Sequence, residues 1–528
     1  MDRAPGGCYN GGSMGVPGLL AGAVWQQSRN SRKEQMMSSM NRRGFLKSTA
    51  AATAGTYAAL SSFGLTPSVL GANEQIRVAV AGIRSRGGAH VNDFNEIEGV
   101  KVVALCDPDK QVLEQGVAGF KKKYNVGDGE IQGYADVREV LDRKDVDALV
   151  IAAPNHWHSL MTVWACQAGK HVYVEKPVSH AIWEGRKMVE AARKYNRIVQ
   201  AGTQHRSCPA VQEAGRDIQA GKYGKVQWIH CSVLHARATI GKVTEPTPVP
   251  AGIDYNLWCG PAPMTPVMRK SFHYDWHWQW AWGDGEMANW GIHYLDDVRH
   301  MLGWTDVPTK VVAAGNRFAW DDDGQTPNVH FALMDYDGLP LVVDIRNLPD
   351  PANRGGQQGA LYQGARGGNY IQCEGGSVRI SRGGGWFHDN DGKRVYQYKG
   401  TGGSGHSNNF INAIRSGRRE DLAAEIEVGH YGTTICHQAN VAWRAGKAAP
   451  VDEVREAMRS HEDAADTLYA VLKQLDGNNV NLLQKPFVLG PALTYDRKTE
   501  RFVGDNAERA NPFIKCSYRE PFVLRDEV

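Results

Sequence analysis

Lys176 stands in the tripeptide Glu175-Lys176-Pro177, directly after an apolar run, residues 171–174, that is typical of a buried β-strand. In an open α/β sheet the carboxyl ends of the strands face the ligand crevice, so a lysine at this point would face a bound molecule. Pro177 fixes its own φ and stiffens the turn, which would present Lys176 in one direction. An ammonium group held in this way could donate to a reacting oxygen and stabilise developing negative charge. The tripeptide taken alone fits a solvated surface lysine better, so its context has to decide.

A second polar group lies near position 290. In the helix predicted for residues 285–301, Asn289, His293, Asp296 and Asp297 share one face, because residues three or four apart are neighbours on a helix. This face combines an amide, an imidazole and carboxylates. An imidazole with a pKa near neutrality is suited to proton transfer. The alternative for His293 taken alone is a core histidine whose hydrogen bonds are satisfied.

A glycine turn and an acid follow the first predicted strand, residues 76–81. The turn is Gly82-Ile83-Arg84-Ser85-Arg86-Gly87-Gly88, a helix follows it, and a second strand ends at Asp107. Strand, glycine turn, helix, strand and acid form the dinucleotide-binding pattern, in which the helix N-terminus receives the pyrophosphate and the acid binds the ribose hydroxyls. Asp107 would repel a 2′-phosphate and so favours NAD over NADP. Arg84 stands where the pattern expects its middle glycine and could pair with phosphate, which leaves NADP possible. A βαβ unit without a nucleotide is the alternative.

The elements that must position these residues divide the chain into two parts. Residues 75–202 alternate strands and helices, which predicts a Rossmann domain with a doubly wound parallel sheet. Residues 203–450 predict an α+β domain with a large open, mostly antiparallel sheet. Residues 451–528 are interpreted as a C-terminal extension with one helix at 451–475 and no assigned function. Predicted Rossmann helices are 110–124, 136–141, 159–167 and 181–195.

The segment of residues 272–282 is dense in aromatic rings, which could stack on the C–H faces of a carbohydrate or pack between domains. Within it His273, Asp275 and His277 alternate and could share one face of a strand. Two histidines and a carboxylate could bind a transition metal, but this spacing also arises by chance and we assign no metal site. The cysteines are scattered, without a Cys-x-x-Cys pair.

The N-terminal 71 residues differ from the rest. Residues 1–35 are rich in Gly and Ser and predict disorder. Residues 36–71 contain Arg42-Arg43, then Phe45-Leu46-Lys47 and a mildly apolar run, the order typical of a twin-arginine export signal, so we expect a periplasmic protein. A short amphipathic helix is the alternative. Without this segment the chain is nearly neutral, which gives no electrostatic case for nucleic acid or an anionic membrane.

These motifs together resemble the Gfo/Idh/MocA oxidoreductases, the sugar and cyclitol dehydrogenases. The matching residues, in order, are Gly82 and Gly87, Asp107, Pro154-Asn155-x-x-His158, Glu175-Lys176-Pro177, Gly202-Thr203-Gln204-His205-Arg206 and Asn289-x-Gly291-x-His293-x-x-Asp296. The resemblance spans residues 75–450. It implies an enzyme that transfers hydride between a sugar, cyclitol or glycoside hydroxyl and a nicotinamide cofactor, NAD or NADP. We also expect a homo-oligomer.

The resemblance also implies roles. Lys176 would bond the reacting oxygen and His293 would accept the hydroxyl proton, with Asn289 and Asp296 orienting His293 or binding neighbouring hydroxyls. The residues expected at the cofactor are Gly82, Ile83, Arg84, Arg86, Gly87, Asp107, Pro154, Asn155, His158, Glu175, Lys176, Gln204 and Arg206. The family often has Asp where this chain has Asn289, so the imidazole would be less basic. Two alternatives remain: glycoside cleavage through transient oxidation with the cofactor restored in each cycle, and a binding protein that keeps the fold without the chemistry.

Overall fold

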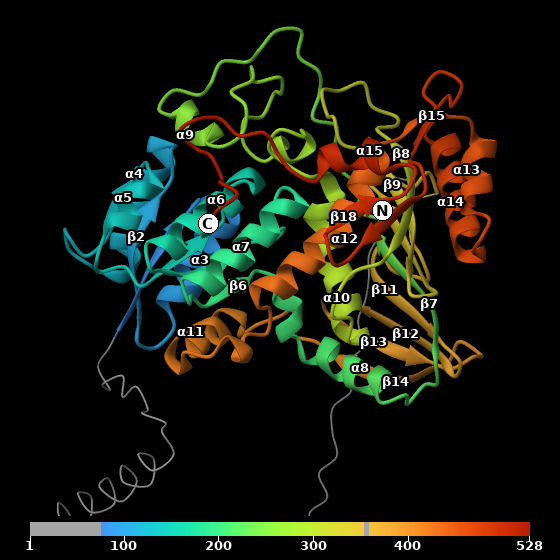
Figure 1. Ribbon diagram of the computed structural model, residues 1–528, viewed down its shortest axis with the longest axis horizontal. Coiled ribbons are helices and arrows are strands. Elements are labelled where there is room, and N and C mark those ends of the chain that lie inside the picture. The colour runs from blue at the N-terminus through green and yellow to red at the C-terminus, as the bar shows by residue number, and fades with distance from the viewer. Residues whose placement is uncertain (1–74, 353–357) are drawn as a thin grey trace, which may run out of the picture. The chain divides into compact units, whose positions relative to one another are not determined.

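The computed structural model describes residues 75–352 and 358–528 (Figure 1). The predictions for residues 1–35 and 36–71 fall outside the described residues. Among the helices in these two ranges, each is too short or too polar to cross a lipid bilayer.

The first sheet has six strands, all parallel, in the order β3-β2-β1-β4-β5-β6. Its buried strands are nearly continuous apolar runs, as expected when helices cover both faces. The strands are β1 (Ile76–Ala81), β2 (Val100–Cys106), β3 (Gln132–Tyr134), β4 (Ala148–Ile151), β5 (His171–Val174) and β6 (Val199–Ala201). The helices between them are α3 (Ser85–Asn95), α4 (Lys110–Tyr124), α5 (Val137–Asp142), α6 (Asn155–Gln167) and α7 (Ile182–Lys194). The predicted doubly wound parallel sheet is confirmed.

Helix α6 begins earlier than the sequence predicts. We expected a helix from residue 159, but it starts at Asn155, with Pro154 as its N-cap residue. Proline is well suited to a helix start because it needs no backbone N–H partner there. The polar residues after β4 therefore lie in the first turn of a helix rather than in a loop.

The second sheet contains twelve strands and is mostly antiparallel, as predicted. Along its main path the order is β14-β13-β12-β11-β7-β10-β9-β8-β16-β15, with β17 and β18 attached at β8. Among the described strands of this second sheet, only β7 and β10 pair in parallel. The strands are β7 (Val226–Val233), β8 (Lys310–Asn316), β9 (Val329–Tyr336), β10 (Leu339–Arg346), β11 (Gly367–Cys373), β12 (Gly376–Ser381), β13 (Gly384–His388), β14 (Arg394–Lys399), β15 (Lys447–Ala449), β16 (Phe487–Leu489), β17 (Leu493–Asp496) and β18 (Arg501–Val503).

Helices α8 (Pro209–Gln219), α10 (Ile292–Leu302) and α12 (Ile426–Arg444) supply apolar residues to the core that covers this sheet. Helix α12 also lies against α7 of the first sheet, so it joins the two halves of the fold. Helix α11 (His406–Ser416) instead packs its apolar residues into the core of the first sheet.

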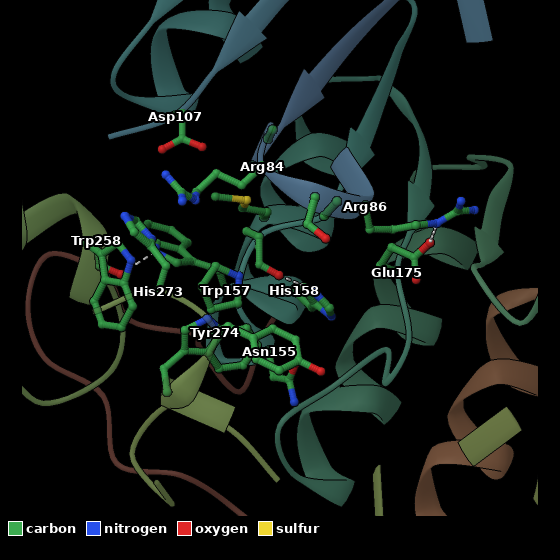
Figure 2. Close-up of a pocket in the computed structure, with 18 of the residues that line it drawn as sticks. Arg84, Arg86, Asp107, Asn155, Trp157, His158, Glu175, Trp258, His273 and Tyr274 are labelled. Carbon is green, nitrogen blue, oxygen red and sulfur yellow. Dashed lines mark hydrogen bonds and ion pairs between the residues drawn. The ribbon is translucent and has the colours of Figure 1, made fainter. Parts of the chain in front are cut away.

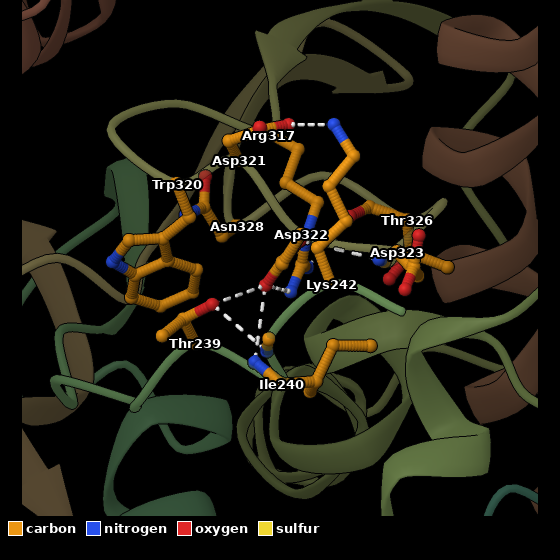
Figure 3. Close-up of polar contacts among 12 residues, drawn as sticks. Thr239, Ile240, Lys242, Arg317, Trp320, Asp321, Asp322, Asp323, Thr326 and Asn328 are labelled. Atoms are coloured by element: carbon orange, nitrogen blue, oxygen red, sulfur yellow. Dashed lines mark hydrogen bonds and ion pairs between the residues drawn. The ribbon is translucent and has the colours of Figure 1, made fainter. Parts of the chain in front are cut away.

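The segment between β7 and α10 is largely irregular and is anchored by Asp322. The Asp322 carboxylate pairs with Arg317 and accepts hydrogen bonds from Thr239 Oγ1 (2.9 Å) and the Ile240 backbone N–H (3.1 Å), as Figure 3 shows. Short helices α9 (Tyr255–Cys259) and η2 (Asp275–Trp278) interrupt the segment. Because a buried ion pair fixes its first residues, the segment has a defined course toward the first sheet.

The C-terminal residues, predicted as an extension, pack on both halves of the fold. Two helices, α13 (Val451–Met458) and α14 (Glu462–Gly477), replace the single predicted helix, and strands β16 to β18 join the second sheet. The last residues return to the first sheet, where Phe522 and Leu524 pack in its core. The chain end therefore stabilises both halves.

Candidate functional site

A cavity of about 720 Å³ lies at the carboxyl ends of the first sheet and is lined by residues from both halves of the fold (Figure 2). Twelve of the sequence-predicted site residues line it: Gly82, Arg84, Arg86, Asp107, Pro154, Asn155, His158, Glu175, Lys176, Gln204, Asn289 and His293. The irregular segment adds an aromatic wall that includes Trp258, Tyr274 and Trp276. The structure thus brings Lys176 from the first half of the fold together with Asn289 and His293 from the second half at one cavity.

The glycine turn forms a close-fitting cradle at one end of the cavity. Gly82 has φ +77°, and a Cβ there would lie 2.6 Å from the Ala153 backbone nitrogen. A Cβ on Gly87 would lie 1.7 Å from the Gly82 carbonyl oxygen. Only glycine fits at either position, which lets helix α3 begin against the strand and direct its first N–H groups to the cavity.

Asp107 is fixed by the same turn. Its carboxylate accepts hydrogen bonds from the backbone N–H of Ile83 (3.1 Å) and of Asp109 (3.0 Å). Burial raises the pKa of Asp107, and these two backbone donors oppose that rise. Ile83 thus serves Asp107 through its backbone rather than lining the cavity. A carboxylate held at this strand end fits the two hydroxyls of an adenosine ribose.

Arg84 extends along the cavity beside Asp107 instead of blocking the cradle (Figure 2). Its side chain is about half exposed, and its Nη1 lies 3.9 Å from Asp109 Oδ2. His273, from the irregular segment, places Nε2 3.2 Å from the same carboxylate. The cradle, the fixed acid and the displaced arginine together fit a dinucleotide cofactor.

Glu175 is a buried carboxylate that ties α3 to the end of β5. Its Oε1 accepts from Arg86 Nε (2.9 Å) and lies 2.7 Å from His90 Nε2. Burial favours the neutral acid, but His90 and Arg86 together hold the pKa of Glu175 well below its usual range. Glu175 and Arg86 therefore form an ion pair at the cavity wall.

Lys176 is held by one partner from the second half of the fold. Its Nζ donates to the Asn289 backbone carbonyl (2.8 Å) and to Asn289 Oδ1 (3.3 Å). Burial lowers the pKa of Lys176, and the carboxylates of Glu175 and Glu286 act in the opposite direction. A lysine bonded by neutral oxygens and facing a cavity keeps a donor available for a ligand.

His293 lines the cavity and is almost fully buried. Its ring stacks on that of His205, with centroids 4.9 Å apart and planes inclined by 29°. His205 Nδ1 lies 3.0 Å from Asp297 Oδ2, so a buried polar contact fixes the His205 ring on which His293 stacks. Burial is the main cause that holds the pKa of His293 well below its usual value, and electrostatic interaction with Lys176 and His205 lowers it further. The imidazole is therefore neutral near pH 7 and can accept a proton.

Asp296 and Arg206 do not lie at the cavity, which corrects the roles predicted for both. Arg206 Nε and Nη2 donate to the two carboxylate oxygens of Asp296, at 2.7 and 2.8 Å, and both side chains are buried. A bidentate pair of this kind satisfies both charges. Helix α10 begins only at Ile292, and Asn289 lies in the π-helical turn before it. The Asp296 carboxylate is occupied by arginine. Gly87 also lies off the cavity and acts through its close packing.

Two family models match the chain. Residues 76–203 match the NAD-binding Rossmann fold of the Gfo/Idh/MocA oxidoreductase family, and residues 237–369 match the C-terminal alpha/beta domain of the same family. The chain belongs to the Gfo/Idh/MocA family. Its first domain is therefore an NAD-binding domain, as the cradle and Asp107 indicate.

Curated relatives match over a limited length. A glycosyl hydrolase family 109 protein of Shewanella baltica is 32% identical over 174 residues, which is 30% of this chain and 38% of that protein. An alpha-N-acetylgalactosaminidase of Shewanella oneidensis matches to the same extent, 32% identical over 174 residues, again 30% of this chain and 38% of that protein. The chain thus aligns with well under half of either relative.

Solved structures share the fold over a greater length. The WlbA dehydrogenase of Bordetella pertussis, in complex with NADH and UDP-GlcNAcA, has a TM-score of 0.51 and 18% identity and covers 69% of this chain and 95% of its own. A levoglucosan dehydrogenase in complex with NADH and levoglucosan has a TM-score of 0.52 and 16% identity and covers 69% of this chain and 96% of its own. At these identities the likeness concerns the fold.

Asn155 and His158, which Gfo/Idh/MocA resemblance places near the nicotinamide ribose, are both held by buried partners. Asn155 Nδ2 donates to Asp284 Oδ2 (2.8 Å), which leaves its amide oxygen available to the cavity. The His158 ring nitrogens lie 2.6 Å from the Pro177 carbonyl oxygen and 2.7 Å from that of Ala153. His158 thus links the end of β4 to the turn that carries Lys176.

The aromatic segment is not a strand, so the predicted shared face of His273, Asp275 and His277 is wrong. Residues 275–278 form the 3₁₀ helix η2, and His273 and His277 contact different carboxylates, those of Asp109 and Glu286. Among the described residues no group of three or more His, Cys, Asp or Glu side chains is arranged to bind a metal.

Several residues at the site were missed by sequence reasoning. Asp284 and Glu286 lie behind Asn155 and Asn289, and His205 lies behind His293. His205 was visible within the matching motif Gly202–Arg206, whereas the two acids carry no local signal beyond their place before the helix. A buried acid is recognised only once its partner from another element is known.

Proposed function

We propose that the protein is an NAD(P)-dependent oxidoreductase that transfers hydride between a nicotinamide cofactor and a carbohydrate hydroxyl, on a sugar, a cyclitol or a glycoside. The observation that carries the proposal is that Lys176 and His293 line the same cavity as the nucleotide cradle. The aromatic wall of that cavity supports a carbohydrate ligand, because flat rings stack on sugar C–H faces.

The roles follow from the surroundings of each side chain. Lys176 would donate to the reacting oxygen, since its two protein partners, both on Asn289, are neutral acceptors. His293 would take the hydroxyl proton, since its imidazole is neutral and lines the cavity. The bound cofactor supplies the hydride acceptor. Asp107 would hold the adenosine ribose and favour NAD, with Arg84 able to approach a phosphate.

A second candidate is glycoside cleavage with the cofactor restored in each cycle. The names of the curated relatives, a glycosyl hydrolase and an alpha-N-acetylgalactosaminidase, favour it. Oxidation to a ketone acidifies the neighbouring C–H, a base removes that proton, and the aglycone leaves as its alcohol. Water then adds across the resulting double bond, and hydride returns to the ketone, which gives the free sugar and restores the cofactor. This route requires a second base in the cavity, for which the structure offers Tyr274.

Product analysis tests both candidates. The full-length protein is incubated with NAD and a panel of free sugars and nitrophenyl glycosides, and ketone, NADH and released nitrophenol are quantified. Net ketone and NADH in equal amounts support the dehydrogenase, and nitrophenol release without net NADH supports cleavage. Neither product from any sugar, with nucleotide bound, would overturn both candidates and favour a binding protein.

We also propose that the protein is exported to the periplasm through Arg42-Arg43 with its cofactor already bound. The order of the arginine pair, Phe45-Leu46-Lys47 and the mild apolar run supports export. A cofactor that dissociated after export would be lost, so its dissociation constant should lie below about 1 μM. This corresponds to a binding free energy more favourable than about −8 kcal/mol. Replacing both arginines by lysine should retain the protein in the cytoplasm. Wild-type protein purified from the periplasm should release near-stoichiometric nucleotide on denaturation, whereas empty protein would contradict retention.

A further inference from the structure

Glu286 is a buried carboxylate one contact away from the lysine of the proposed site. It is 1% exposed and stands directly before the π-helical turn η3 (Met287–Gly291), which carries Asn289. Burial would raise the pKa of Glu286, yet contacts with His277, Arg237 and Asn289 lower it to about 2. The fold therefore keeps a negative charge inside the protein, where an unpaired charge would be costly.

Three side chains surround this carboxylate. Arg237 Nη2 lies 3.1 Å from Glu286 Oε1, and His277 Nε2 lies 3.5 Å from the same oxygen. Asn289 Nδ2 donates to Oε1 at 2.9 Å. Arg237 and His277 both come from the irregular segment that builds the aromatic wall, so the carboxylate joins that wall to η3.

The bond to Glu286 fixes the orientation of the Asn289 amide. Because Nδ2 is bound to the carboxylate, Oδ1 faces Lys176 Nζ at 3.3 Å, alongside the backbone carbonyl at 2.8 Å. A flipped amide would place N–H groups against the ammonium and its oxygen against the carboxylate. Each flipped contact is repulsive, so the charge of Glu286 dictates that two oxygens face the lysine.

Glu286 is one of two carboxylates whose charge acts on Lys176. Glu175 adjoins it on the same turn, but the Glu175 carboxylate is already bound by Arg86 and His90. Asn289 itself carries no charge. The titratable groups that act on Lys176 from the elements packed around it are Glu175, Glu286, Arg86, His293 and Cys436.

We propose that Glu286, held by Arg237 and His277, is a positioning residue that acts on Lys176 through Asn289. It fixes the amide that holds Nζ. Its charge adds to that of Glu175 in opposing the loss of the lysine's proton on burial. The proposal rests on the proposed function, in which Lys176 donates to the reacting oxygen.

The first test replaces the charge and keeps the shape. In Glu286→Gln an amide oxygen can still accept from Asn289, but the negative charge is gone. We expect kcat to fall at least tenfold with little change in KM. The basic limb of the kcat profile should move to lower pH, because a lysine that loses a neighbouring carboxylate loses its proton more readily. The double variant Glu286→Gln/Asn289→Asp places a carboxylate next to Nζ again. It should return the basic limb of the kcat profile toward its wild-type pH.

Two further measurements keep the proposal falsifiable. Trace acetylation of the full-length protein, followed by mass spectrometry across a pH series, reports the protonation of Lys176 without turnover. Lys176 in Glu286→Gln should react at lower pH than in the wild type, with exposed Lys110 as the internal reference. Asn289→Ser leaves Glu286 paired with Arg237 and His277 and removes only the link. It should lower kcat as Glu286→Gln does, and it covers the case in which Glu286→Gln fails to fold.

The outcomes separate this inference from the proposed function. A wild-type pH profile and wild-type acetylation of Lys176 in both Glu286→Gln and Asn289→Ser would overturn the inference, even if Lys176 is essential. Hydride transfer that is unaffected by loss of Lys176 would overturn the role of the lysine in the proposed function. The acetylation series would still report whether Glu286 controls the charge of the lysine.

Discussion

Replacing Lys176 with methionine tests the proposed reaction most directly. Methionine is an unbranched side chain one atom shorter than lysine, and it removes the ammonium that bonds the Asn289 carbonyl (2.8 Å) and Oδ1 (3.3 Å). Loss of one preorganised donor to a developing oxyanion costs about 2.7–4 kcal/mol. At about 1.4 kcal/mol for each factor of ten, hydride transfer should slow by about 10²–10³-fold.

The variant should also be less stable, and this effect must be separated from the chemical one. Asn289 Oδ1 would lose its donor, and because this acceptor is only partly buried the cost should lie below that of a fully buried one, about 1–3 kcal/mol. Lys170→Met is a matched control, because Lys170 precedes β5 as Lys176 follows it and its Nζ donates to the carbonyls of Arg143 and Val146. Lys170→Met should lower the unfolding temperature and leave hydride transfer unchanged.

The assay is single-turnover reduction of bound nicotinamide, measured with a protiated substrate and with one deuterated at the reacting carbon. In Lys176→Met the slower step should show the full deuterium isotope effect, because hydride transfer then limits the rate. A wild-type rate in folded Lys176→Met would remove the lysine from the mechanism. An equal loss of rate in Lys170→Met would show that the loss reflects stability rather than chemistry.

Three further perturbations test the cofactor end and the proton balance. Asp107→Asn keeps an oxygen for a backbone donor and removes the charge, so the affinity for NADP should rise about tenfold relative to that for NAD. Calorimetric titration with both cofactors measures this ratio. An unchanged ratio would indicate that Arg84, and not Asp107, sets the choice between the two cofactors. Gly82→Ala should destabilise the fold by about 1 kcal/mol or more and abolish nucleotide binding, because its Cβ would lie 2.6 Å from a backbone nitrogen at φ +77°. Gly119→Ala, in α4 with nothing within 4 Å, should instead stabilise by about 0.5–1 kcal/mol in thermal unfolding. Because the pKa of His293 lies well below 6.5, oxidation should slow only as pH falls well below that value, and it should also slow as pH rises through the lowered pKa of Lys176. A pH–rate profile with its acid limb at or above 6.5 would contradict the role of His293.

The first sheet could be predicted from the sequence nearly element by element, for a physical reason. Its strands are buried on both faces, so they read as apolar runs, and β1, β2 and β5 have the predicted bounds. Glycine at position 82 and the acid at 107 then mark the strand ends. In this sheet the edge strand β3 was missed, because it has three residues and one of them is glycine. In the second sheet β13, which begins with two glycines, and the largely exposed edge strand β14 were also missed.

The candidate site was predicted less completely, because helix periodicity shows which residues share a face but not what packs against it. His293 and Asp296 share a face, yet Arg206, which is 90 residues earlier in the chain, takes up the carboxylate. Similarly, the polar run after β4 was read as a loop, although Pro154 and the helix-compatible residues after it allowed an earlier helix start. Pairing over such distances depends on the fold, and the sequence contains no local trace of it.

The same reasoning explains how the chain can carry Asn289 where the family often has Asp. Judged from sequence alone, this substitution removes a charge and weakens the site. In the structure a carboxylate is present one contact further out, at Glu286. It pairs with Arg237 and lies 3.5 Å from His277, and both residues come from the segment that also builds the aromatic wall. The negative charge has moved from a residue that would touch the lysine to one that acts through an amide. An amide oxygen accepts a hydrogen bond but does not become protonated, whereas a carboxylate can take up a proton. The Asn289 oxygen can therefore hold the ammonium without competing for its proton, and Lys176 keeps a hydrogen to donate to the reacting oxygen.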